Sequence, residues 1–295
     1  MMLDSRVLEA PLLDHRGLDL DAAGRVTYVL QQSLRYEYDS PVESLRQRLV
    51  VVPPARHGSQ YRRAHRLDVH GVQARRSVRR DRNGNVVAWL QADRVPEAIE
   101  FRLAAVLERV RADGPAVLPA AALVSPPLLK PTRLTAADDR LRALADRLRE
   151  PDDTPLESAQ RVCDAVHAAI SYEYGVTTVR TTAAEALALG RGVCQDSAHV
   201  MLALCHLLGL PARYVSGHLL GQGGTHAWVE VIVARADDAM AVAFDPCNGR
   251  RAGAGYVTVA TGRDYGDVAP ASGSCTGSSP GRLTANRRVG VLAVA

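Results

Sequence analysis

The sequence is poor in aromatic residues, in long apolar runs and in net charge, and each shortage excludes a class of protein. Aromatic residues make up 4% of the chain, so its cores must be built mainly from leucine, valine and alanine. No apolar run approaches the roughly 18 residues of a membrane-spanning helix. The formal charge of +4 is small for 295 residues. Composition therefore predicts a soluble protein and gives no indication of a nucleic-acid partner.

Paired cysteines are also missing. The five cysteines are odd in number and form no Cys-x-x-Cys motif; they are Cys163, Cys194, Cys205, Cys247 and Cys275. This pattern disfavours a disulfide framework and a zinc ribbon and is typical of reduced thiols. The first residues lack the apolar run of a signal peptide, so we expect a cytoplasmic protein. The histidine and cysteine spacing matches no zinc pattern, and we predict neither a metal nor another cofactor.

The chain divides into two main segments. Residues 25–110 alternate apolar and polar side chains, and Asn83-Gly84 between two such runs is a strong hairpin signal. We predict an antiparallel β-domain here, most simply a sandwich. The proline-rich residues 111–134 are predicted to be a linker, and residues 1–24 an extension or loose arm. Residues 135–295 open with helices, two of which begin with capping boxes at Thr154 and Thr182, and continue into strands. The fold class is therefore α+β.

One segment of the C-terminal half carries reactive side chains. Cys194 follows Gly192-Val193 and begins an apolar helix that ends at Gly209. The partial positive charge of a helix start favours an anion, and the thiolate is the reactive form of cysteine. His226 opens a predicted strand, and Asp245 ends the next one. If the two strands are antiparallel, a base lies beside the thiol and a carboxylate lies behind the base, as nucleophilic catalysis requires.

Several motifs in order resemble the bacterial transglutaminase-like family, within the wider papain-like group. The matching stretches are Gly192–Asp196, Pro211–Gly217, His226–Glu230, Phe244–Pro246 and Gly262–Pro270. The resemblance implies a catalytic core of helices packed on an antiparallel sheet, preceded by the family's β-domain. It also implies a Cys-His-Asp triad, which falls on Cys194, His226 and Asp245. Ser197 and Cys247 depart from the residues common in the family, an aromatic residue and a threonine respectively.

Four further side chains are candidates for contacts with the substrate or the oxyanion: Gln195, Asp196, His199 and Trp228. Each also has a structural interpretation. Asp196 suits the start of a helix, His199 suits a hydrogen-bonded core position, and Trp228 suits the core as well as a pocket wall.

The predicted function is thiol-dependent acyl transfer on a peptide or protein amide. The acceptor decides between a peptidase or amidase and a transamidase, and the sequence leaves that choice open, together with the oligomeric state. The alternative is a noncatalytic peptide- or protein-binding module on the same fold.

Overall fold

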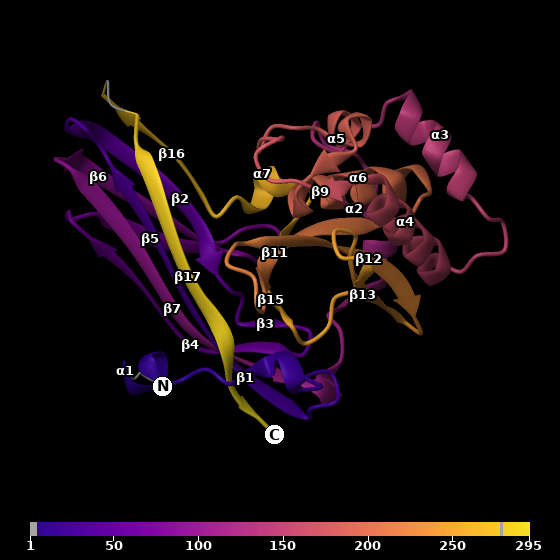
Figure 1. Ribbon diagram of the computed structural model, residues 1–295, viewed down its shortest axis with the longest axis horizontal. Helices are drawn as coiled ribbons and strands as arrows, with labels where there is room; N and C mark the ends of the chain where they lie inside the picture. The colour runs from indigo at the N-terminus through magenta and orange to yellow at the C-terminus, as the bar shows by residue number, and fades with distance from the viewer. Residues whose placement is uncertain (1–4, 278–279) are drawn as a thin grey trace.

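The computed structural model describes residues 5–277 and 280–295. One of its two main parts is an antiparallel β-domain (Figure 1). A five-stranded sheet has the order β17-β1-β7-β4-β3, and a four-stranded sheet has the order β16-β2-β6-β5. The strands are β1 (Arg25–Glu37), β2 (Val42–Val52), β3 (Arg56–His57), β4 (Gln60–His70), β5 (Arg75–Arg80), β6 (Val86–Val95), β7 (Ala98–Val110), β16 (Ala271–Thr276) and β17 (Arg282–Val294). The predicted antiparallel β-domain is thus present.

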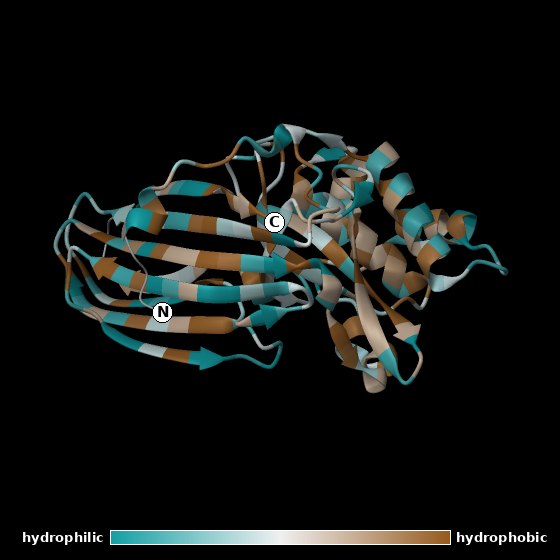
Figure 2. Ribbon diagram, turned by 90° about the horizontal axis from the view of Figure 1, so that it is seen from below, coloured by the Kyte–Doolittle hydropathy of each residue, from teal (hydrophilic) through white to brown (hydrophobic). Residues whose placement is uncertain are grey.

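The alternation in the sequence explains why these segments are strands. Along β1, Val26, Tyr28 and Leu30 are buried in the core that both sheets share, and Figure 2 shows hydrophobic and hydrophilic residues alternating along the strands of this domain. The predicted hairpin joins β5 to β6. Gly84 has a φ of +80° in its turn, a conformation that glycine adopts without steric cost.

The end of the chain returns to the β-domain. β17 pairs with β1, and β16 pairs with β2; in Figure 1 the yellow strand β17 lies beside the indigo β1. The predicted catalytic segment 135–295 was therefore too long, because its last two strands complete the N-terminal sheets. An alternating strand shows in its sequence which face is buried but not which distant strand it pairs with.

The core that carries the candidate site has a six-stranded antiparallel sheet, and its longer helices lie on one face of this sheet (Figure 1). Its strands are β8 (Val117–Pro119), β11 (Ala212–Leu219), β12 (His226–Arg235), β13 (Asp238–Asp245), β14 (Arg250–Arg251) and β15 (Tyr256–Gly262). The helices are α2 (Pro126–Leu129), α3 (Asp139–Leu148), α4 (Pro155–Ala169), α5 (Ala183–Leu189), α6 (Cys194–Leu207) and α7 (Tyr265–Val268), and β9 (Ser171–Tyr172) pairs with β10 (Arg191–Gly192). Both predicted capping boxes are present, at the starts of α4 and α5. Among the described residues, no helix is long and apolar enough to cross a membrane.

The central strand β12 separates the helices from the β-domain. Its residues Val229 and Val231 belong to the large core that includes α6. The alternate residues Trp228, Glu230 and Ile232 face the other way, because successive side chains of a strand point to opposite faces. Glu230 reaches His57 of the β-domain, and Ile232 packs on residues 116–128.

Two predicted connecting segments are parts of the packed structure. Within the predicted linker 111–134, β8 pairs with β13, and Leu118 and Leu128 pack against Ile232. Within the predicted loose arm, α1 (Ser5–Glu9) places Leu8 on β1 and β7. Proline and the absence of periodicity favoured a linker and a loose arm, but isolated leucines in both segments cover apolar strand faces that would otherwise meet water.

Side-chain amides of the β-domain bind the outer edge of β15. The Gln60 side chain donates to the carbonyl of Thr258 (2.8 Å) and accepts from its N–H (2.9 Å). Asn85 makes the same pair of bonds with Thr261, at 2.7 and 2.9 Å. Both amides are buried. They satisfy backbone groups of an edge strand that would otherwise lack partners, and so they fix the core on the β-domain.

Candidate active site

Cys194 is half-buried at the first position of α6. The N–H of Val193 donates to the Asp196 carboxylate (2.8 Å), and the Thr177 hydroxyl donates to the same oxygen (2.7 Å). A Cβ on Gly192 would lie 2.6 Å from that oxygen, so only glycine leaves room for this helix start. The glycine before the cysteine therefore fixes the backbone that presents the thiol.

His226 and Asp245 come together because β12 and β13 are antiparallel neighbours, as predicted. His226 Nε2 lies 2.7 Å from Asp245 Oδ2, and both residues are buried. The same carboxylate accepts from the Tyr256 hydroxyl (2.7 Å), from Asn248 Nδ2 (2.6 Å) and from the backbone N–H groups of Cys247 and Asn248. These bonds to the charged form hold the pKa of Asp245 below its usual value, although burial alone would raise it.

The imidazole of His226 lies between this carboxylate and the Cys194 thiol. Burial lowers its pKa, but the hydrogen bonds and charges of Asp245 and Cys194 outweigh that effect and raise the pKa to about 9. Near neutral pH the ring therefore carries a proton on both nitrogens. Because Nε2 is bonded to Asp245, Nδ1 is the nitrogen available to Cys194. The structure thus brings Cys194, His226 and Asp245 to one place.

Two aromatic rings pack against the imidazole. The rings of Trp228 and Tyr256 have centroids 6.1 and 5.9 Å from that of His226. Trp228 is buried, and a Cβ on Gly217 would lie 2.5 Å from its ring. Trp228 therefore fills the core beside His226, and its role as a wall of the substrate site stays a prediction.

The three other candidates have partners of their own. Gln195 Nε2 lies 3.4 Å from the carbonyl of Thr178, and Asp196 is the buried acceptor at the start of α6. His199 is fully buried, and its Nε2 accepts from the N–H of Tyr265 (3.2 Å). Burial lowers its pKa to about 4, so the ring is neutral. Asp196 therefore stabilises the start of α6, and His199 stabilises α7.

Comparison with known proteins agrees with this arrangement. Residues 142–246, which include all three residues of the cluster, match the sequence model of the transglutaminase-like superfamily. Residues 28–108 match the model of the bacterial transglutaminase-like N-terminal region. These matches identify residues 142–246 as a transglutaminase-like core and residues 28–108 as a bacterial transglutaminase-like N-terminal domain.

Individual relatives extend the likeness over most of the chain. Uncharacterized protein ML0607 of Mycobacterium leprae is 32% identical over 160 residues, which are 51% of this chain and 55% of that protein. This chain therefore spans about half of that relative. Uncharacterized protein Rv2569c of Mycobacterium tuberculosis is 28% identical over 276 residues, with 84% of this chain and 83% of that protein covered. The crystal structure of a candidate cysteine protease from Cytophaga hutchinsonii superposes with a TM-score of 0.75, covers 91% of each chain and is 22% identical, which establishes a shared fold.

Two residues that hold the Asp245 carboxylate of the transglutaminase-like core were not predicted from the sequence. Asn248 and Tyr256 both donate to Asp245. Asn248 lies three residues beyond the carboxylate, where a side chain that can close a turn is a usable signal. Tyr256 has no such signal, since it comes from a strand that does not neighbour β13. In residues 5–277 and 280–295, no cluster of three or more His, Cys, Asp or Glu side chains suits a metal ion.

Three other thiols of the transglutaminase-like core are buried or half-buried. Burial raises the pKa of Cys163, Cys205 and Cys247 to about 12. For Cys247 the nearby charges of Cys194 and Asp245 add to the effect of burial. These three thiols are therefore protonated at neutral pH and are poor nucleophiles.

Proposed function

We propose that this chain is a thiol-dependent acyl-transfer enzyme that acts on peptide or protein amides, with Cys194 as nucleophile, His226 as general acid and base, and Asp245 as the group that orients His226. One observation carries the proposal. An imidazole with a pKa of about 9 lies between a thiol at a helix start and a buried carboxylate. A protonated imidazole beside a cysteine favours the thiolate, which is the nucleophile.

The first half-reaction forms a thioester. The Cys194 sulfur attacks the amide carbonyl, and the carbonyl π electrons move to its oxygen. The first N–H groups of a helix have no partner within the helix, so those of Cys194 and Gln195 at the start of α6 are suited to bind that oxyanion. When the C–N bond breaks, the nitrogen takes its electron pair and a proton from His226 Nδ1, and it leaves as an amine.

The second half-reaction regenerates the thiolate. Neutral His226 accepts a proton from the acceptor as the acceptor attacks the thioester carbonyl, and the C–S bond then breaks. Water as acceptor makes the enzyme a peptidase or amidase, and a primary amine makes it a transamidase. Asp245 stays ionised and stabilises the imidazolium through both steps.

The decisive variant is Cys194→Ala, compared with Cys275→Ser at an exposed cysteine of β16. Both proteins are given a library of glutamine-containing and other peptide amides, with and without a fluorescent primary amine. Released ammonia or amine, amine incorporation and the acyl adduct on the protein are then measured by mass spectrometry. We expect turnover and a thioester on Cys194 in the Cys275→Ser protein and neither in Cys194→Ala. Equal turnover in the two variants would refute the proposal.

Iodoacetamide labelling separates the enzyme from a noncatalytic binding module. Cys275→Ser removes the exposed competitor, and the thiols of Cys163, Cys205 and Cys247 are protonated. We expect Cys194 to be alkylated well below pH 8 and His226→Ala to abolish that reactivity. Labelling of Cys194 that rises only above about pH 8.5, as for a free thiol, would favour the binding module.

We also propose two finer assignments of the fold: a sandwich for the two sheets of the β-domain, and a papain-like arrangement for α6 on its sheet. They rest on the core shared by the two sheets and on the burial of α6 against β12. A cytoplasmic location is proposed on the reduced cysteines alone.

A further inference from the structure

Strand β5 is an uncovered edge of the β-domain. It ends the four-stranded sheet β16-β2-β6-β5, pairs only with β6 among the described residues, and is exposed at all six of its positions. The N–H and C=O groups on its other edge therefore have no partner strand in the part of the chain that the structure describes. A free edge of this kind can accept one more strand, including an extended peptide from another chain.

Arginine occupies four of the six positions of β5 and both of its faces. Arg76 and Arg80 lie opposite buried residues of β6 and so face the other sheet of the β-domain. The bond from Arg76 to the carbonyl of Leu67 in β4 (2.6 Å) confirms this direction. Arg75 and Arg79 lie on the opposite, outer face, because side chains alternate along a strand. A strand added to β5 would therefore meet arginine on both of its own faces.

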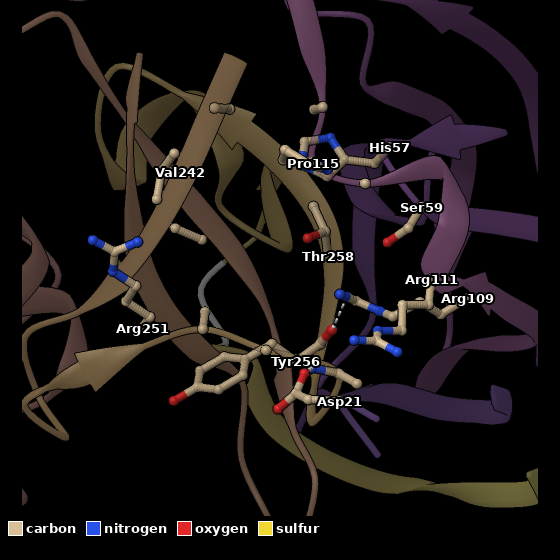
Figure 3. Close-up of a pocket in the computed structure, with 18 of the residues that line it drawn as sticks. Asp21, His57, Ser59, Arg109, Arg111, Pro115, Val242, Arg251, Tyr256 and Thr258 are labelled. Atoms are coloured by element: carbon tan, nitrogen blue, oxygen red, sulfur yellow. Dashed lines mark hydrogen bonds between the residues drawn. The ribbon is translucent and has the colours of Figure 1, made fainter. Parts of the chain in front are cut away.

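Other arginines of the β-domain have structural partners. Figure 3, a close-up of the cavity between the β-domain and the core, shows the bond that Arg109 donates to the carbonyl of Tyr256 (2.9 Å). Arg79 and Arg80, in contrast, have neither a hydrogen bond nor a salt bridge with any described residue. Their guanidinium groups are therefore available to a ligand, and each offers a fork of donors that matches a carboxylate.

Positive charge also gathers behind the inner face of β5. Desolvation lowers the pKa values of Arg62 and His65 in β4. The charge of Arg80 adds to this effect at Arg62, and the charges of Arg62 and Arg76 add to it at His65. Charged residues on a strand often protect a sheet edge from self-association, but such protection needs no further cations behind the strand. Crowded cations of this kind repel one another, and a bound anion would relieve that repulsion.

An acidic peptide fits this edge better than a second copy of the chain or a nucleic acid. Within β5, Arg75 has a carboxylate partner, Asp93 at 2.8 Å, and both side chains are exposed. A second copy would bring four more arginines to the edge, and like charges on paired strands are destabilising. A nucleic acid would match the charges but would leave the free backbone groups of β5 without a ladder, whereas a peptide supplies both.

We infer that an extended acidic segment of another protein binds to β5 as an additional strand, with carboxylates on both of its faces against Arg79 and Arg80. This inference does not depend on the proposed reaction. The charge pattern of β5, Arg-Arg-Ser-Val-Arg-Arg, reads the same in both directions. The peptide Glu-Glu-Thr-Val-Glu-Glu therefore complements it whether the added strand is parallel or antiparallel.

Three fluorescein-labelled probes test the inference by fluorescence anisotropy at about 0.15 M salt. They are Glu-Glu-Thr-Val-Glu-Glu, the equally charged Glu-Glu-Pro-Pro-Glu-Glu and hexathymidylate. The protein is Cys194→Ala, so that no acylation of Cys194 consumes a probe. We expect the first peptide to bind at least about tenfold tighter than the other two. The proline peptide lacks an N–H that the ladder needs, and the oligonucleotide lacks the peptide backbone altogether.

Matched double variants in the Cys194→Ala background locate the binding. Arg79→Gln with Arg80→Gln removes one charge from each face of β5 and should weaken binding of the first peptide at least about tenfold. Arg140→Gln with Arg147→Gln, at exposed positions of α3, changes the net charge equally and should leave binding unchanged. Thermal unfolding verifies that both proteins are folded.

Binding of the peptide should also slow amide hydrogen exchange along β5, where the new ladder forms. Four results would overturn the inference: no binding of the first peptide at about 1 mM, equal binding of the two peptides, tighter binding of hexathymidylate, or equal affinities in the two double variants. Tighter binding of hexathymidylate would instead identify the arginines of β5 as a nucleic-acid surface.

Discussion

Strand β12 contributes one residue to each of two histidine–carboxylate pairs with a buried carboxylate, and the two pairs differ in the other groups that contact the carboxylate. At the start of the strand, His226 lies 2.7 Å from Asp245. Four residues further along, Glu230 lies 2.6 Å from His57. Apart from His226, the donors to Asp245 are neutral. Glu230 in contrast has a second cation, Arg213, at 2.7 Å.

This difference separates a reactive pair from a docking pair. Among residues 5–277 and 280–295 no arginine pairs with Asp245, so its charge is balanced by the His226 imidazolium, whose other nitrogen is available to the Cys194 thiol. Glu230 is balanced on both sides, and its pKa lies far below the usual value although burial alone would raise it. It joins the core to β3 of the β-domain. Under the proposed function, the same two residue types support chemistry in one place and domain contact in the other.

The largest predicted effect is that of Asp245→Asn on turnover. Replacing the carboxylate that orients a catalytic histidine lowers kcat by about 10⁴ in a Ser-His-Asp triad, and we expect a loss of the same order here. The measurement is kcat on whichever amide Cys194 acylates, together with thermal unfolding to verify folding. Asp139→Asn on the exposed side of α3 is the control. A folded Asp245→Asn protein with nearly full activity would show that the two pairs do not differ in function.

Glu230→Gln should lower the free energy of unfolding, whereas the chemistry at Cys194 should be unaffected. It leaves Arg213 and His57 without their buried partner, and breaking a buried pair costs about 3–5 kcal/mol. Because the folded-state pKa of Glu230 is lowered, its contribution is present above the unfolded pKa of about 4.3 and is lost as the pH falls below it. Urea unfolding of wild type and variant should therefore differ at pH 7 and converge in acid. Glu43→Gln, in an exposed pair, should change stability by less than about 1 kcal/mol. A pH-independent difference would contradict this account.

Gln60→Leu tests how much the uncharged hydrogen bonds to the backbone of β15, as opposed to ion pairs, stabilise the contact between the β-domain and the core. The variant removes both bonds to the backbone of Thr258 and should cost about 1–3 kcal/mol. Amide hydrogen exchange at Thr258 should become faster, while exchange at Val229 in the centre of β12 stays slow. Unchanged exchange along β15 would mean that the amide of Gln60 does not hold this edge.

Tyr256→Phe should give the smallest effect, confined to the reactive pair. It removes one neutral donor to Asp245 and keeps the ring against Trp228. Loss of one hydrogen bond to a charged group should lower kcat about tenfold, with a smaller change in unfolding than Glu230→Gln causes. Full activity in Tyr256→Phe would contradict this prediction and would mean that the remaining hydrogen-bond donors suffice to hold Asp245.

The sequence made the reactive cluster predictable because each of its members lies at the end of an element with a local signal. Cys194 follows Gly192-Val193 and begins an apolar helix, and His226 and Asp245 lie at adjacent ends of consecutive strands. Tyr256, Gln60 and Asn85 could not be found in this way, because one polar residue in a strand is ordinary until its partner is known. The return of β16 and β17 to the β-domain was hidden for the same reason, since the pairing of distant strands leaves no periodic trace.

The central claim is that Asp245 and Cys194 hold His226 in its protonated form, and a titration of the His226 ring by NMR tests it directly. Spectra of the wild type, with His226→Gln for assignment among the nine histidines, should show a pKa of about 9 for His226. In Cys194→Ala the pKa of His226 should fall, because the hydrogen bond and charge of Cys194 contribute to the shift. A wild-type pKa at or below the ordinary value of about 6.5, unchanged in Cys194→Ala, would contradict the account.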